Sequence, residues 1–127
     1  MQSPFKPYIQ WETPIAFSIT FFNILFWGVL FSLPVLTLLA GIIVALGLIV
    51  RRIESWPLFE TLYWTFITAL TVGYGDIRPT QKAARVLSVL IAIIGVMMTG
   101  ILVAIAVEAA STAFEHHVGV RFLEEGS

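Results

Sequence analysis

The chain has 127 residues, of which 58% are hydrophobic and only 12% are charged, and its formal net charge is −1. Soluble globular domains carry about 25% charged residues, so this composition excludes a protein whose surface faces water throughout, and it also excludes a disordered chain. Because the seven Lys and Arg residues are scattered rather than clustered, nucleic-acid binding is excluded as well, and a small integral membrane protein remains.

The first stretch without a formal charge covers the 38 residues 13–50. A continuous helix of that length would reach about 57 Å, whereas one membrane crossing needs about 20 residues. Pro34 is the only helix breaker near the middle of the stretch. We therefore expect a crossing helix over 33–50 and an N-terminal segment over 1–32. The aromatic-rich helix within that segment, 13–31, either lies in the membrane interface or continues the crossing helix.

The second uncharged stretch covers the 22 residues 86–107, which suffices for one crossing, and we expect a helix over 83–113. Between the two crossings, Pro57 is typical of a helix start. The apolar segment 57–69 is too short to span a bilayer and is suited to a half-helix that re-enters the membrane. Backbone that is not helical at membrane depth must line a water-filled cavity or be buried in protein. Residues 114–127 are expected to form a short tail.

The residues that follow this half-helix are Thr71 to Gly75, which read TVGYG, and then Asp76. With this motif between two crossings, the chain resembles the two-crossing bacterial potassium channels over residues 38–108. The resemblance implies an all-α integral membrane fold: an outer helix, a re-entrant pore helix with a filter loop, and an inner helix. It also implies a pore domain over 33–113 that assembles as a homotetramer in the lipid bilayer. Monovalent cations, with K⁺ as the permeant ion, are its implied partners, and no cofactor is implied.

The chemistry of potassium conduction explains the residue types of this motif. An ion that loses its water in a narrow pore needs replacement oxygens, which rings of backbone carbonyls supply. Aiming successive carbonyls inward requires φ > 0 at alternating residues, and Gly73 and Gly75 reach that conformation without steric cost. The C-terminus of the half-helix adds a partial negative charge that favours a cation. The resemblance assigns the K⁺ sites to the carbonyls of Thr71, Val72, Gly73 and Tyr74, with the Thr71 hydroxyl at the inner end.

The residues expected to support the filter depart from one pattern of the family. Some bacterial members have a Glu in the pore helix that pairs with the filter Asp, and here that position is Ile67. The resemblance then makes Tyr63 the expected hydrogen-bond partner of Asp76. It also places Trp64 where it would brace Tyr74.

The inner helix contains the candidates for gating. Gly95 is either a gating hinge or a small residue that allows close helix packing, and Gly100 is a second hinge candidate. Glu108 ends the apolar run, where it either attracts cations or marks the helix end. Helical periodicity and the resemblance together place Val96, Thr99, Val103, Val107 and Ser111 toward the pore.

Two other function classes compete with a potassium channel. An enzyme is excluded, because the chain has no cysteine, no zinc-ligand spacing, no phosphate-binding loop and no set of nucleophile and base. The alternative is the pore of a prokaryotic glutamate receptor, which has this filter in the inverted orientation but also an extracellular ligand domain and a further crossing.

Two arguments disagree on how the chain is oriented in the membrane. Five basic residues lie between the crossings and two lie outside them. Because the positive-inside rule places the side with more Lys and Arg in the cytoplasm, it favours the inverted orientation. Family geometry favours a multi-pass protein of the cell membrane with both termini cytoplasmic, and this is our expectation. The five basic residues are Arg51, Arg52, Arg78, Lys82 and Arg85, and the other two are Lys6 and Arg121.

Overall fold

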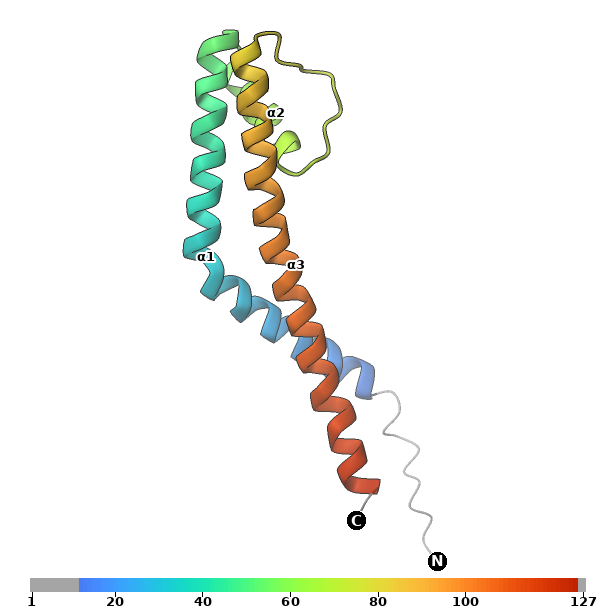
Figure 1. Ribbon diagram of the computed structural model, residues 1–127. Helices are drawn as coiled ribbons and strands as arrows, with labels where there is room; N and C mark the ends of the chain where they lie inside the picture. The colour runs from blue at the N-terminus through green and yellow to red at the C-terminus, as the bar shows by residue number, and fades with distance from the viewer. Residues whose placement is uncertain (1–11, 126–127) are drawn as a thin grey trace, which may run out of the picture. The chain divides into compact units, whose positions relative to one another are not determined.

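The computed structural model describes the backbone of residues 12–125 and the side chains of residues 14–116. The described backbone consists of three α-helices, α1 (Glu12–Glu54), α2 (Leu58–Ala69) and α3 (Lys82–Glu125), and contains no strand (Figure 1). The expected all-helical fold is thereby confirmed. The chain divides into two compact units, residues 32–102 and residues 1–31 with 103–127, and each is described here by itself.

The two long helices extend beyond the ranges expected from sequence. Helix α1 is continuous from Glu12 to Glu54 with Pro34 inside it, so the expected boundary at residue 33 does not interrupt the helix. A proline removes one backbone hydrogen bond, and in an apolar stretch the neighbouring backbone groups still gain most by bonding within the helix. Helix α3 continues past residue 113 to Glu125, because this stretch contains no proline to end it and includes the helix-forming residues glutamate, leucine and arginine.

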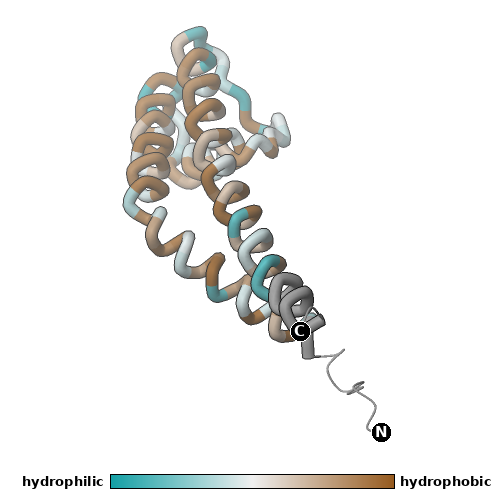
Figure 2. The backbone as a smooth tube through the Cα atoms, turned by 60° about the horizontal axis from the view of Figure 1, so that its bottom comes forward, coloured by the Kyte–Doolittle hydropathy of each residue, from teal (hydrophilic) through white to brown (hydrophobic). Residues whose placement is uncertain are grey.

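Both long helices are long and apolar enough to cross a membrane, over Pro14–Glu54 and Lys82–His116. Hydrophobic residues predominate along each of them (Figure 2). Within their most apolar windows, only 17% and 11% of the residues are buried inside the chain. Most of the apolar surface therefore needs another apolar environment, as a bilayer or further copies of the chain provide.

The unit of residues 32–102 has its hydrophobic core around the short helix α2, which packs beside α1 and α3 (Figure 1). Trp64 and Ala69 of α2 are buried, at 4% and 1% exposure. Thr61 and Thr65 of α2 are fully buried. The Thr61 hydroxyl donates to the carbonyl of Pro57, the N-cap of α2, and the Thr65 hydroxyl donates to the carbonyl of Thr61. The core residues from the long helices are Ile43, Val50, Ala84 and Ile91.

Two glycines let α2 approach the long helices closely. A Cβ atom at Gly47 of α1 would overlap the side chain of Thr65, whose Cγ2 would lie 2.8 Å away. A Cβ atom at Gly95 of α3 would overlap the backbone of Ala69, whose Cα and carbonyl carbon would each lie 2.6 Å away. Helix α2 therefore packs between Gly47 of α1 and Gly95 of α3. A side chain is less tolerated at Gly95, because backbone atoms lie opposite it.

The Glu54 carboxylate joins the C-terminal end of α1 to the N-terminal end of α3. Its Oε1 accepts hydrogen bonds from the backbone N–H groups of Thr80 and Gln81, both at 2.8 Å, and its Oε2 accepts from the Thr80 hydroxyl at 2.7 Å. The Gln81 side-chain amide donates in return to the Ile53 carbonyl at 2.8 Å. These N–H groups precede the first turn of α3, where a negative charge is favourable, so Glu54 fixes the start of α3 against the end of α1.

Helix α1 ends in a left-handed residue that is not glycine. Ser55 has φ = 58°, and the N–H of Trp56 donates to the carbonyl of Arg51 at 3.3 Å. This six-to-one hydrogen bond is that of the Schellman motif, which ends helices by satisfying a free carbonyl. The turn reverses the chain and directs it into α2.

In the other unit, the first part of α1 packs against the last part of α3. A Cβ atom at Gly28 would lie 2.6 Å from Cγ2 of Ile105, so the two helices are close at this point. Ala109 and Ala113 of α3 are fully buried, and small residues of this kind permit close helix packing.

Alanine substitutions test how α2 is held. Because the new Cβ atoms would overpack the contacts, Gly47→Ala should destabilise the protein by about 1–3 kcal/mol and Gly95→Ala by more. Gly41→Ala and Gly100→Ala are matched controls, since a Cβ atom at either glycine meets nothing within 4 Å. Thermal unfolding in detergent, followed by tryptophan fluorescence, measures the difference. Equal midpoints for Gly95→Ala and Gly100→Ala would contradict this account.

Candidate functional site

The loop after α2 has an alternating backbone. Thr71, Gly73 and Gly75 have φ values of 61°, 52° and 78°, whereas Val72 and Tyr74 between them are not among the residues with positive φ. This is the alternation that sequence analysis required, with glycine at two of the three positions. Thr71 was not predicted to take part, although the period of two that includes residues 73 and 75 also includes residue 71. For a β-branched residue this conformation is a strained outlier.

The amides and carbonyls of this loop have different environments. The N–H groups of Val72 and Gly73 both donate to the Ile67 carbonyl of α2, at 2.9 and 3.1 Å, and the N–H of Thr71 donates to the Thr68 carbonyl at 3.1 Å. Within the described part of the chain, no hydrogen bond reaches the carbonyl oxygens of residues 71–74. The loop is therefore anchored through its amides, while four successive carbonyl oxygens remain available to a ligand.

Helix α2 ends next to these carbonyls. Its last residue is Ala69, its C-cap is Leu70, and its last turn has no basic residue. The N–H of Leu70 donates to the Phe66 carbonyl at 2.9 Å, which completes the turn. No basic side chain in this turn therefore opposes the partial negative charge of the helix C-terminus, which adds to the carbonyl dipoles and favours a cation.

Tyr63 connects α2 to the far side of the loop. Its hydroxyl donates a hydrogen bond to the Asp76 carboxylate. Partial burial, and then Asp76, raise the pKa of the Tyr63 phenol above its usual value. The phenol therefore keeps its proton and remains a donor at neutral pH, and the bond ties the end of the loop to the middle of α2.

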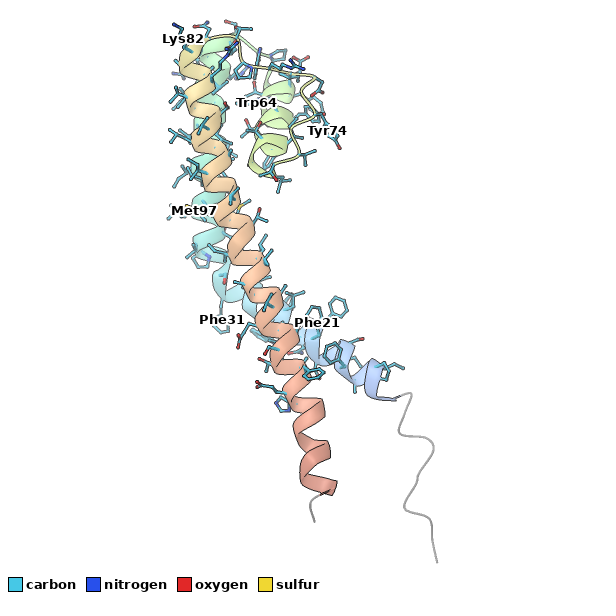
Figure 3. All side chains as sticks on the ribbon, turned by 45° about the vertical axis from the view of Figure 1, so that its right-hand side comes forward. Phe21, Phe31, Trp64, Tyr74, Lys82 and Met97 are labelled. Carbon is cyan, nitrogen blue, oxygen red and sulfur yellow. The ribbon has the colours of Figure 1, made fainter. Side chains whose placement is uncertain are left out.

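The aromatic contacts within one chain differ from those expected. The Trp64 ring packs edge-on against Trp56, with the ring centroids 5.3 Å apart, and no ring contact with Tyr74 occurs in the described residues. Tyr74 projects from the loop and is 72% exposed (Figure 3). Within a single chain, Tyr74 is thus free to meet a neighbour.

The loop contains one interaction that sequence analysis missed. Nε of Arg78 donates to the Gly75 carbonyl at 2.8 Å, so the last carbonyl of the motif differs from the four before it. Sequence analysis considered Arg78 only as one of the basic residues that bear on orientation. The only feature of the sequence that could have predicted this hydrogen bond is the spacing of three residues between Gly75 and Arg78, which a tight turn can bridge.

The gating candidates on α3 have different environments. Gly95 is buried against α2, whereas Gly100 is exposed. Glu108 is exposed. The residues expected to face a pore share exposure in the single chain; they are Val96, Thr99, Val103, Val107 and Ser111.

Comparison with known proteins supplies independent evidence. The ion channel family model matches residues 13–112. Over 53 residues, 42% of the chain and 10% of the relative, the chain is 36% identical to "TWiK family of potassium channels protein 7" of Caenorhabditis elegans. It is 34% identical over 61 residues to "Open rectifier potassium channel protein 1" of Drosophila melanogaster, covering 48% of the chain and 6% of that protein. It is 44% identical over 43 residues to a "Voltage-gated potassium channel" of Aeropyrum pernix, covering 34% of the chain and 13% of that protein.

The matches to single relatives cover much less of the chain than the match to the family model does. The chain spans a small fraction of each relative's own length, and no solved structure is significantly similar to it. The family model, in contrast, extends over residues 13–112, which include nearly all of α1, all of α2, the loop and α3 as far as residue 112. With its two apolar helices, the chain therefore belongs to the ion channel family and is a multi-pass membrane protein rather than an enzyme.

Proposed function

We propose that the chain forms a potassium-selective pore and that its loop over residues 71–75 is the selectivity filter. The observation that carries this proposal is the file of carbonyl oxygens at residues 71–74, which accept no hydrogen bond in the described chain while their neighbouring amides are bonded to α2. Backbone carbonyls at membrane depth need partners, and a dehydrated cation is a partner that carbonyl rings select. The named relatives are potassium channels, which supports K⁺ as the ion.

The pore requires four copies of the chain. A single file of carbonyls supplies a quarter of each oxygen ring, so one copy cannot surround an ion. Tyr74 and Val72 are 72% and 48% exposed in one chain, and a neighbouring copy would cover these apolar surfaces. The ring of Trp64 in the adjacent copy is our proposed partner for Tyr74. Val107, Glu108 and Ser111 then lie toward the narrow end of the permeation path.

We propose the orientation with both termini in the cytoplasm and the α1–α2 turn outside the cell. The inverted orientation of glutamate-receptor pores gains no support, because the relatives described above are named as potassium channels. The basic residues that favour inversion are partly engaged: Arg78 bonds the Gly75 carbonyl and Arg85 interacts electrostatically with Glu54. The positive-inside rule counts the basic residues of free loops, so it applies less well to Arg residues that are held by such interactions.

Substitution in the filter tests the assignment of the site. Gly75→Ala should abolish K⁺ preference or conduction, because φ = 78° strains any residue with a Cβ and turns the carbonyls in every copy at once. Gly41→Ala is the control, since a Cβ atom there meets nothing within 4 Å. Rubidium uptake into proteoliposomes, with sodium as competitor, measures the effect. Unchanged selectivity in Gly75→Ala would refute the site.

Removal of one hydroxyl tests the support of the filter. Tyr63→Phe should make the current decay faster at low external K⁺, because Asp76 loses its partner and the filter its link to α2. The effect should be small at high external K⁺, where bound ions hold the carbonyls in place. Decay that is the same in both proteins at low K⁺ would show that the bond does not support the filter.

Cross-linking tests the oligomeric state. Purified protein that conducts in liposomes should give a ladder ending at four copies, because a complete oxygen ring needs four loops. The Tyr74→Ala variant should give fewer four-copy products if this ring packs on the neighbouring copy. A conducting preparation in which cross-linking ends at two copies is incompatible with the proposal.

Cysteine labelling tests orientation, and the absence of native cysteine makes it clean. In intact cells, an impermeant thiol reagent added outside should label Ser55→Cys, because Ser55 lies exposed in the α1–α2 turn. It should not label Ser127→Cys until the cells are opened. The reverse pattern would establish the inverted orientation.

A further inference from the structure

Arg78 forms a hydrogen bond that places its charge at the end of the carbonyl file. Its Nε lies 2.8 Å from the Gly75 carbonyl oxygen. A Cβ atom built on Gly75 would lie 3.4 Å from Nη2 of Arg78 and 3.5 Å from its Nε, so the whole guanidinium stands against this residue. Both observations place this exposed side chain against the loop at Gly75.

The charge of this guanidinium is not neutralised nearby. In the part of the chain that the structure describes, Arg78 forms no salt bridge with a carboxylate. Asp76, the acidic residue closest to it in sequence, accepts its hydrogen bond from Tyr63 instead. Glu54 accepts its hydrogen bonds from Thr80 and Gln81. Because a guanidinium is protonated at every physiological pH, each copy of the chain carries a permanent positive charge at this point.

We propose that Arg78 is a fixed cation that controls entry to the filter, and this proposal rests on the proposed function above. The guanidinium occupies the Gly75 carbonyl, so that the carbonyls of residues 71–74 remain for the permeant ions. Its charge has the same sign as the permeant ion, and repulsion lowers the concentration of cations at this mouth of the pore. Arg78 thus limits the rate of cation entry without contributing an oxygen to selectivity.

The repulsion predicts a specific dependence on ionic strength. Screening extends over about 30 Å at 0.01 M salt but only about 3 Å at 1 M. The effect of removing the charge should therefore be large in dilute salt and should vanish in concentrated salt. A change that acted through folding or through the shape of the filter would persist at both ionic strengths.

Single-channel recording in bilayers of neutral lipid tests the proposal. Permeant cation is held at about 10 mM, and ionic strength is raised to about 1 M with N-methylglucamine chloride, which spans the two screening limits. Arg78→Gln is compared with the unaltered protein, with Arg78→Lys, which keeps the charge, and with Arg52→Gln, which removes the same charge from the last turn of α1. Each protein is recorded in K⁺ and in Na⁺.

The proposal predicts that Arg78→Gln has a conductance at least about threefold higher at low ionic strength and equal to the unaltered protein at high ionic strength. Arg78→Lys should stay close to the unaltered protein, and Arg52→Gln should change less than Arg78→Gln. Equal conductance of Arg78→Gln and the unaltered protein in dilute salt would overturn the proposal, as would an increase that persists at 1 M. If the unaltered protein carried K⁺ and Na⁺ equally, the proposed function would fail, whereas the conductance ratio would still decide the role of Arg78.

Discussion

The structure depends on one constraint: a membrane protein must satisfy its backbone carbonyls, and the four successive carbonyls of residues 71–74 have no hydrogen-bond donor among the described residues. An ordinary loop would gain stability by turning them toward amides. Here the amides of Val72 and Gly73 are committed to the Ile67 carbonyl, and alternating positive φ values turn the backbone. In the filter that we propose, a cation along residues 71–74 would satisfy these carbonyls and offset the strain at Thr71.

A loop with this conformation needs a rigid support. The contacts at Gly47 and Gly95 explain how the chain holds α2, from which the loop extends, in place. Gly47 and Gly95 bring α2 against both long helices, while Glu54 joins the ends of those helices. The Tyr63 hydroxyl then ties Asp76, which follows residues 71–75, to α2. The loop is held at its start, through its amides and at its end, which leaves the carbonyls as its free groups.

Sequence reasoning found the parts that depend on local pattern. The TVGYG motif, the short helix before it and the two apolar crossings follow from residue types and spacing. It missed what depends on three-dimensional contact. The role of Gly47 requires knowing that Thr65 faces it, and the Arg78 bond requires the turn that brings it to Gly75. Helix α1 continues through Pro34 because one lost hydrogen bond does not outweigh a long apolar helix.

The central claim is that the carbonyls of Thr71, Val72, Gly73 and Tyr74 bind potassium-like ions in the assembled protein. Anomalous diffraction from crystals grown in rubidium tests it most directly, because rubidium replaces potassium and is located without reference to the protein phases. The account predicts rubidium peaks on a fourfold axis, level with these four carbonyls. Crystals of a fourfold assembly that show no rubidium between these carbonyls, under conditions in which the protein conducts rubidium, would contradict it.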